Sequence, residues 1–229
     1  MTEEPKRKEV LSTKSIYLIA IAFYVENSTI RTIFEIITFT GEAIFFIILI
    51  AIFYITYDKK FAKNLAFSLL FSVYVNEVLK NLFQDPRPPT NADPNEEFGL
   101  TETGYGFPSG HSQNAVATWG YLAQEFKNKT QPNIIIPAIL STWIFLIALS
   151  RIIIGVHDLQ DIVGGLLIGI LFLVAFIHLE PIVSEKVNPL SIGVKMTLIF
   201  ATSMGLFIIG TLAFPTTGQG LLEDPVPYA

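Results

Sequence analysis

The chain has 229 residues, of which 51% are hydrophobic and 15% are charged, and its mean hydropathy is +0.52. This composition is too apolar for an ordinary soluble domain and is typical of a chain that crosses a membrane several times. The formal net charge of -5 comes without a basic stripe, which argues against a nucleic-acid partner, and the lack of cysteine excludes disulfides and thiolate metal sites.

The N-terminal part of the chain is expected to lie on the membrane rather than to cross it. Residues 1–10 lack the apolar run and the cleavage site of a signal peptide, and a short apolar arm follows from Ser15 to Val25. Beyond this arm, apolar residues recur at helical spacing and polar residues occupy the other faces, which predicts an amphipathic helix on the membrane surface. The recurring apolar residues are Ile30, Ile33, Phe34 and Ile37.

The alternative is that residues 15–40 form one additional tilted span. Glu26, Arg31 and Glu35 make this alternative costly, because each would carry a charge into the hydrocarbon. In its favour, a crossing would place the basic group at residues 6–8 on the cytoplasmic side. The sequence leaves both arrangements open.

Six segments after residue 42 are predicted to cross the membrane, because a span needs roughly 20 mostly apolar residues to cover a core of about 30 Å. The third is the least hydrophobic and carries Gln113, Asn114 and Gln124, so we expect it to be buried among the other helices. The predicted fold is therefore all-α, a polytopic transmembrane bundle of about six spans with an amphipathic N-terminal helix. The six segments cover approximately residues 43–57, 61–83, 111–126, 133–150, 159–179 and 192–214.

The distribution of lysine predicts how the bundle is oriented. Basic residues gather in alternate loops, and the positive-inside rule places those loops in the cytoplasm. The loops on the other side, 84–107 and 151–158, are mainly acidic and are expected to face outside. Lys80, Arg87 and Arg151 are the exceptions, and all three lie at or just beyond the outer ends of spans. The cytoplasmic cations are Lys59, Lys60, Lys63, Lys127, Lys129, Lys186 and Lys195.

These three outer cations are distant in sequence but share one membrane level, and together they predict an anion site. Arginine offers a planar fork that matches phosphate oxygens, and lysine adds a point charge. Ser109 and Gly110 open the third span at the same level, where the free N–H groups of a helix N-terminus favour an anion. A phosphate dianion is the expected occupant.

Two of the three histidines lie at this level as well. His157 and Asp161 are four residues apart, so on a helix they share a face, and the carboxylate can fix the tautomer of the imidazole. The other ring nitrogen of His157 then carries a lone pair toward the anion, which is the arrangement of an activated nucleophile. His111, on another helix, is placed to give a proton to a leaving oxygen.

Three motifs in this order resemble those of the type 2 phosphatidic acid phosphatase superfamily, membrane lipid phosphatases related to the vanadium haloperoxidases. The family pattern Lys-x6-Arg-Pro is matched by Lys80 to Pro88, and Pro-Ser-Gly-His is matched by Pro108 to His111. The pattern Ser-Arg-x5-His-x3-Asp is matched by Ser150 to Asp161. Every motif position is filled, so the resemblance covers residues 80–161 with three spaced motifs, of which any one alone would be weak.

The resemblance implies a role for each motif residue. His157 is expected to be the nucleophile that forms a phosphohistidine, Asp161 its orienting carboxylate, and His111 the general acid for the leaving group. The family's mechanism needs neither a metal nor another cofactor. The phosphate-binding set would be Lys80, Arg87, Ser109, Gly110 and Arg151, supported by Pro88, Pro108 and Ser150.

The expected protein is thus an integral enzyme of the cytoplasmic membrane that hydrolyses the phosphomonoester or pyrophosphate headgroup of a lipid at its outer face. An isoprenoid diphosphate, such as a polyprenyl carrier, and a phosphatidate-like lipid both fit. The alternatives are a lipid-to-lipid phosphotransferase and a non-catalytic headgroup binder or transporter. The lipid bilayer and the lipid substrate are the expected partners, and no oligomeric state is predicted.

The domain boundaries would be 1–42 for the N-terminal arm and interfacial helix, 43–180 for the catalytic core, and 181–229 for an additional span and outer tail.

Overall fold

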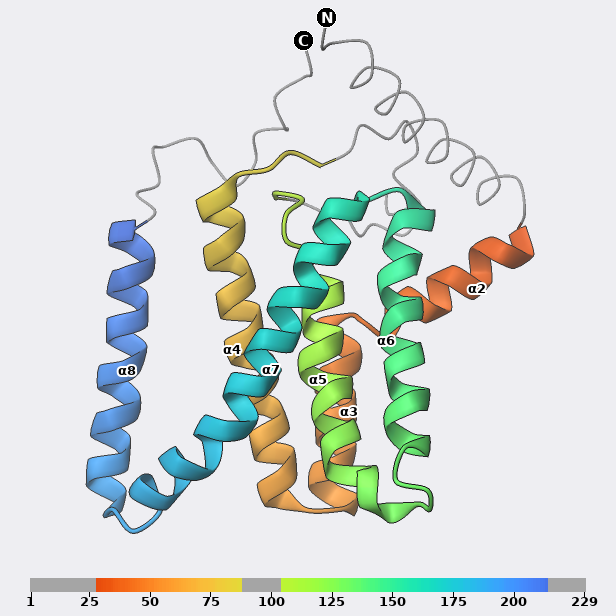
Figure 1. The fold of residues 1–229 in the computed structure, drawn as a ribbon. Coiled ribbons are helices and arrows are strands. Elements are labelled where there is room, and N and C mark those ends of the chain that lie inside the picture. The colour runs from red at the N-terminus through yellow and green to blue at the C-terminus, as the bar shows by residue number, and fades with distance from the viewer. Residues whose placement is uncertain (1–27, 88–103, 214–229) are drawn as a thin grey trace, which may run out of the picture.

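A computed structural model of the chain describes residues 28–87 and 104–213, which form helices joined by turns (Figure 1). There is no strand within these residues, so the predicted all-α fold is confirmed. The apolar arm, most of the 84–107 loop and the C-terminal tail lie outside the described residues. The helices are α2 (Ser28–Phe39), α3 (Ala43–Thr56), α4 (Lys59–Phe83), α5 (Gly110–Phe126), the short 3-10 helix η1 (Lys127–Lys129), α6 (Ile135–Ile154), α7 (Leu159–Val187) and α8 (Ile192–Ala213).

Each predicted span corresponds to one helix from α3 to α8, but not every one of these helices can cross a membrane alone. By length and composition, α4, α6, α7 and α8 are the four described helices that can do so. Helices α2 and α3 meet the same criteria only together, as a pair bent by 56°, which would bring the number to five. The predicted count of about six is therefore approximate. Helix α7 also continues through Pro181 beyond its predicted end at residue 179.

Helix α5 is the centre of the bundle and packs against α4, α6 and α7 (Figure 1). Glycines allow α7 to approach it closely. A Cβ atom on Gly165 would lie 2.6 Å from the Ser109 carbonyl oxygen, and one on Gly169 would lie 2.9 Å from Cβ of Val116. The absence of side chains at these two positions therefore sets the distance between the helix that carries His111 and the helix that carries Asp161.

Two polar side chains of α5, those of Gln113 and Asn114, are hydrogen-bonded to α4. Gln113 is fully buried, and its amide nitrogen donates to the Ser72 carbonyl oxygen at 2.8 Å while its amide oxygen accepts from Asn76 at 2.9 Å. Ser72 donates its hydroxyl proton to Asn114 at 2.8 Å. The predicted burial of this polar helix is confirmed for its N-terminal half, but Gln124 near its C-terminal end is exposed.

The two ends of the described chain are attached differently. Helix α2 packs against α6 and lies at a slant outside it (Figure 1). It forms the helix expected between residues 30 and 40, and its Arg31 is paired with Glu35 at 3.0 Å. Helix α8 stands to the side of the bundle, and no residue of its candidate span is buried. The Tyr74 hydroxyl of α4 donates to the Leu206 carbonyl oxygen of α8 at 3.2 Å.

The close approach of α7 to α5 leads to a stability prediction. The Gly165→Ala substitution should lower the melting temperature of the detergent-solubilised protein by several degrees, because the new methyl group meets a backbone carbonyl, and such overpacking costs about 1–3 kcal/mol. Gly205→Ala on α8 is the matched control, since nothing lies within 4 Å of its added Cβ. It should be neutral or slightly stabilising because alanine favours helices. Equal melting temperatures for the two variants would contradict this account of the interface.

Candidate active site

Four helix ends that carry the sequence motifs lie at one end of the bundle. In Figure 1 the C-termini of α4 and α6 and the N-termini of α5 and α7 all point to the upper side. The helices alternate in direction, so motifs that are far apart in sequence arrive at one level. This arrangement of helix ends is the one that the sequence predicted for Lys80, His111, Arg151 and His157.

The turn between α6 and α7 places His157 between two helix ends. Helix α6 ends at Ile154, and its C-cap residue Gly155 has a φ of 90°, the left-handed conformation that glycine adopts without a Cβ penalty. The N–H groups of Val156 and His157 then donate to the Arg151 carbonyl oxygen at 3.2 and 3.3 Å. Asp158 begins α7 as its N-cap in a reciprocal capping box. His157 therefore lies in the short turn between the C-terminus of α6 and the N-terminus of α7.

His157 and Asp161 form a buried pair. Nδ1 of His157 lies 2.9 Å from Oδ2 of Asp161, and each side chain is only 1% exposed. The Asp158 N–H donates to the same carboxylate oxygen at 3.3 Å. A carboxylate on Nδ1 favours the tautomer that carries its proton there, which gives Nε2 the lone pair.

Arg87 lies on the Nε2 side of the His157 ring. One terminal nitrogen of its guanidinium is 3.4 Å from Nε2 and donates to the Val156 carbonyl oxygen at 3.1 Å. Its Nε donates to the Gly104 carbonyl oxygen at 3.0 Å. Nε2 of His157 therefore faces the guanidinium cation of Arg87. Pro88, the other residue of this motif, lies outside the described residues.

Arg151 is almost completely buried, with 1% of its surface exposed. Its Nη1 donates to Oγ1 of Thr38 at 2.7 Å, a residue of α2 that sequence reasoning did not connect with the motifs. Ser150, which precedes it, is buried and donates its hydroxyl proton to the Ile147 carbonyl oxygen at 2.6 Å. The hydrogen bond of the Ser150 side chain is therefore made within α6 itself.

Ser109 is the N-cap of α5 and is fully buried. Its hydroxyl oxygen accepts from the Ser112 N–H at 3.4 Å and from the Ser112 hydroxyl at 3.1 Å. Its own N–H donates to the Asp161 carbonyl oxygen at 3.0 Å, so this group joins α5 to α7 instead of being offered to a ligand. Gly110 follows, where an added Cβ would lie 3.0 Å from Oδ1 of Asn76, so glycine allows α5 to approach α4.

The remaining motif residues lie at the same helix ends. Lys80 is in the last turn of α4 and is half-buried. Pro108 is fully buried, and its carbonyl oxygen accepts from the Asn76 side chain of α4 at 3.2 Å. Both residues thus lie where α4 meets the start of α5.

His111 contacts an acidic residue that sequence reasoning did not assign to the site. Its Nε2 lies 2.9 Å from Oε1 of Glu42, which is the N-cap residue of α3. The His111 side chain is 12% exposed and that of Glu42 is 32% exposed. Glu42 could have been noticed in the sequence as a single carboxylate at the start of a helix that is almost entirely apolar.

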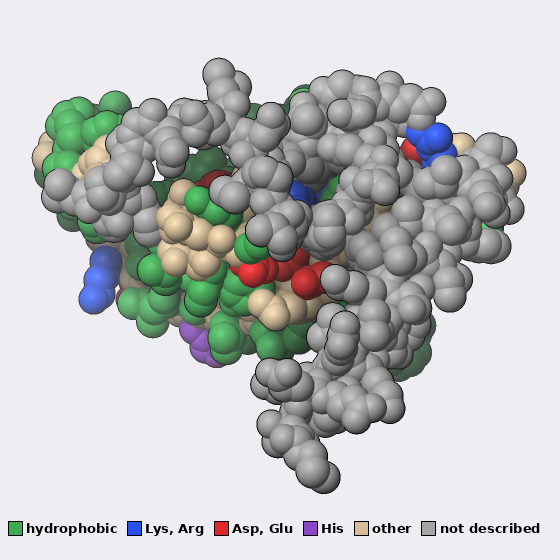
Figure 2. All heavy atoms as spheres, turned by 90° about the horizontal axis from the view of Figure 1, so that it is seen from above, with side chains coloured by type: hydrophobic (Ala, Val, Ile, Leu, Met, Phe, Trp, Pro, Cys, Tyr) green, Lys and Arg blue, Asp and Glu red, His purple; other side chains and the backbone are tan. Residues whose placement is uncertain are grey.

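Acidic side chains also lie on this face. Figure 2 views the molecule from above and shows acidic side chains near the middle of this face, among hydrophobic ones. Burial, and to a smaller extent the neighbouring Asp158 carboxylate, raises the pKa of Asp85. The carbonyl oxygen of Asp85 accepts from the Gly106 N–H at 2.8 Å, which folds the described part of the loop over the end of α4.

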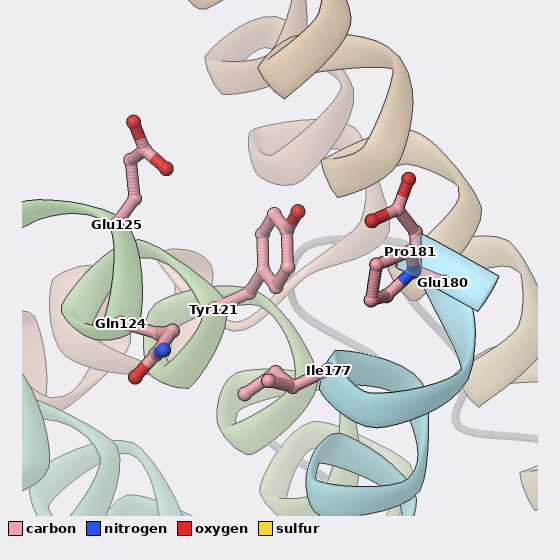
Figure 3. A pocket seen from close by; sticks show the side chains of 6 residues that line it. All are labelled: Tyr121, Gln124, Glu125, Ile177, Glu180 and Pro181. Carbon is pink, nitrogen blue, oxygen red and sulfur yellow. The ribbon is translucent and has the colours of Figure 1, made fainter. Parts of the chain in front are cut away.

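A hollow at the opposite end of α5 and α7 contains none of the motif residues (Figure 3). The Tyr121 ring projects into it, with carboxylates on either side. We therefore do not assign the candidate site to this hollow. It is lined by Tyr121, Gln124, Glu125, Ile177, Glu180 and Pro181.

Curated proteins are similar in sequence to part of this chain. Lipid phosphate phosphatase delta of Arabidopsis thaliana is 27% identical over 73% of this chain and 40% of its own length. Phosphatidylglycerophosphatase B of Bacillus subtilis is 30% identical over 42% of this chain and 47% of its own length. The chain thus matches less than half of the length of either relative.

A solved structure has the same fold. It is the crystal structure of a transmembrane PAP2 type phosphatidylglycerolphosphate phosphatase from Bacillus subtilis, and it aligns with a TM-score of 0.61 at 23% identity. The alignment covers 79% of this chain and 88% of that one. The model of the PAP2 superfamily matches residues 61–183, which extend from α4 through most of α7 and contain every motif described above. This chain is a member of the PAP2 superfamily.

Proposed function

We propose that this chain is an integral membrane phosphatase that removes phosphate from a lipid phosphate or diphosphate through a phosphohistidine on His157. The observation that carries the proposal is the environment of the buried imidazole, with the Asp161 carboxylate at 2.9 Å from Nδ1 and the Arg87 guanidinium at 3.4 Å from Nε2. A headgroup binder would need the cation, but it would not need a carboxylate that orients the opposite nitrogen. This difference favours catalysis over binding alone.

The reaction would proceed in two steps. In the first, the Nε2 lone pair of His157 attacks phosphorus and the bond from phosphorus to the leaving oxygen breaks, while protonated His111 gives its proton to that oxygen. In the second, a water oxygen attacks phosphorus, its proton passes to His111, and the phosphorus–nitrogen bond breaks to release inorganic phosphate. Both histidines return to their starting states, so the net reaction consumes water and yields phosphate and the dephosphorylated lipid or the lipid monophosphate.

The cations would bind the phosphoryl oxygens in both steps. Transfer of a phosphoryl group is accelerated mainly by positioning and by charge around its equatorial oxygens. Lys80, Arg87 and Arg151 are proposed to supply this charge without a bound metal. Gly110 would add the N-terminus of α5, while Ser109 would act by holding α5 against α7 through its N–H.

The substrate class follows from chemistry shared with the relatives. One relative is named for lipid phosphates and another for a phosphatidylglycerophosphate, so a phosphate ester on a membrane lipid is common to both. We propose this class for the present chain, with an isoprenoid diphosphate as the first substrate to test because its carrier lipid would be recycled at the outer face. Residues 43–180 would contain the catalytic machinery, residues 1–42 would form the interfacial arm, and residues 181–229 would add α8 and the tail.

Phosphate release tests this function. The purified protein in detergent, with EDTA present, should release phosphate from at least one member of a panel of lipid mono- and diphosphates. His157→Ala should lower the rate by roughly 10³-fold or more, because the nucleophile is lost. His178→Ala on α7 is the matched histidine control, since that exposed side chain bonds the Val174 carbonyl oxygen at 2.8 Å, and it should retain activity.

Several outcomes would contradict the proposal in different ways. No release from any lipid by the unmodified protein would exclude a phosphatase, and full activity in His157→Ala would exclude His157 as the nucleophile. Loss of activity with EDTA would exclude the metal-free mechanism. Transfer of phosphate to an added lipid alcohol in place of water would identify a phosphotransferase.

Cysteine labelling tests the proposed orientation. The chain has no cysteine, so single substitutions give an unambiguous signal. Asn81→Cys near the site end of α4 should react with a membrane-impermeant maleimide applied to intact cells. Asn128→Cys in η1, at the opposite end of the bundle, should react only after the membrane is permeabilised. The reverse pattern would place the site in the cytoplasm and overturn the outward orientation while leaving the chemistry intact.

A further inference from the structure

The turn between α2 and α3, together with the last two residues of α2 (residues 38–42 in all), reaches the candidate site from outside the motif region. Helix α2 ends at Phe39, α3 begins at Ala43, and the two helices are bent by 56°. We propose that this turn is a fourth part of the active site, in which Glu42 is a positioning residue for the proton donor His111. The proposal rests on the phosphatase function above and adds to it a residue that lies outside the three motifs.

The side chain of Glu42 is directed at His111 rather than at its own helix. Glu42 is the N-cap residue of α3, but its side chain makes no capping hydrogen bond to the α3 backbone. Instead its Oε1 lies 2.9 Å from Nε2 of His111. Ser, Thr, Asp and Asn are the residues that cap helices well, and a carboxylate at the start of an apolar span is costly. The contact with His111 accounts for a residue that capping and membrane insertion would not favour.

The backbone of the turn is packed against the same imidazole. A Cβ on Gly41 would lie 3.1 Å from Cδ2 of His111 and 2.7 Å from a methyl carbon of Ile147 on α6. Only a residue without a side chain therefore allows the turn to fit between α5 and α6. This approach brings Glu42 within hydrogen-bonding distance of the ring.

Further hydrogen bonds fix the turn in place and extend it to a second site residue. The indole N–H of Trp143 donates to Oγ1 of Thr40 at 3.0 Å, and that of Trp119 donates to the Thr40 carbonyl oxygen at 3.3 Å. Thr38, two residues earlier at the end of α2, accepts from Nη1 of Arg151 at 2.7 Å. One short segment thus contacts the proposed proton donor on α5 and a proposed phosphate ligand on α6.

The geometry assigns a role to each nitrogen of His111. Glu42 holds Nε2, so Nδ1 is the ring nitrogen that would give its proton to the leaving oxygen in the first step and receive one from water in the second. Glu42 does not touch the substrate in this scheme. It sets the orientation of the ring, in the way that Asp161 does for His157.

Dependence on the leaving group tests this role. A lipid phosphate releases a poorly acidic alcohol that needs a proton, whereas p-nitrophenyl phosphate releases a stable phenolate that does not. Glu42→Ala should therefore lower kcat on a short-chain phosphatidate by about ten- to a hundredfold and change it by less than about threefold on p-nitrophenyl phosphate. Glu42→Gln should recover part of the loss, because its amide oxygen can accept the same hydrogen bond.

Two controls separate positioning from folding. Glu35→Ala, on α2 and paired with Arg31, should leave both substrates at the rates of the unmodified protein. In a His111→Asn background, Glu42→Ala should add no further loss, because Glu42 acts through His111. Activity on p-nitrophenyl phosphate also reports that each variant is folded.

Three outcomes would overturn the positioning role while leaving the phosphatase function in place. They are equal losses on the two substrates, no loss on either substrate, and additive losses in the His111→Asn background. If the unmodified protein acts on neither substrate, nor on the lipid panel, the phosphatase function fails and the role of Glu42 fails with it.

Discussion

A single backbone hydrogen bond, from the Ser109 N–H to the Asp161 carbonyl oxygen at 3.0 Å, joins the start of α5 to the start of α7. In a membrane, backbone groups must find partners within the protein, because lipid offers none. This bond satisfies a donor of an N-cap residue and at the same time sets the register of two helices that carry different motifs. Gly165 makes it possible, since any side chain there would displace the Ser109 carbonyl. The relative position of His111 and His157 depends on this contact.

The same constraint explains why so many polar side chains are buried. Arg151, His157 and Asp161 are each at most 1% exposed, and an unpaired charge at such a position would be strongly destabilising. Arg151 donates a hydrogen bond to Thr38 of α2, and His157 lies between Arg87, which follows α4, and Asp161 in the first turn of α7. A membrane protein that retains charged groups under this cost generally uses them. The superfamily match over residues 61–183 is consistent with that use.

The elements and the common level of the motifs could be predicted because both depend on local patterns. Apolar runs indicated α3 to α8, and a spacing of four indicated the contact between His157 and Asp161. Glu42 and Thr38 could not be assigned in this way. They meet His111 and Arg151 across 69 and 113 residues of sequence, and no periodicity connects them. The direction of the Ser109 N–H and the continuation of α7 through Pro181 also depend on packing that a linear pattern does not contain.

The placement of the motifs at helix ends rather than at the middle of the bundle has a consequence for the search for substrate. A lipid can bring its headgroup to this level while its tails stay in the hydrocarbon. Extraction into water costs about 0.8 kcal/mol for each methylene, so a tail of about 14 methylenes would cost on the order of 10 kcal/mol. A lipid phosphatase of the proposed kind, with its site at this depth, would avoid that barrier. Its encounters with substrate would then be governed by diffusion in two dimensions and by the surface density of the lipid.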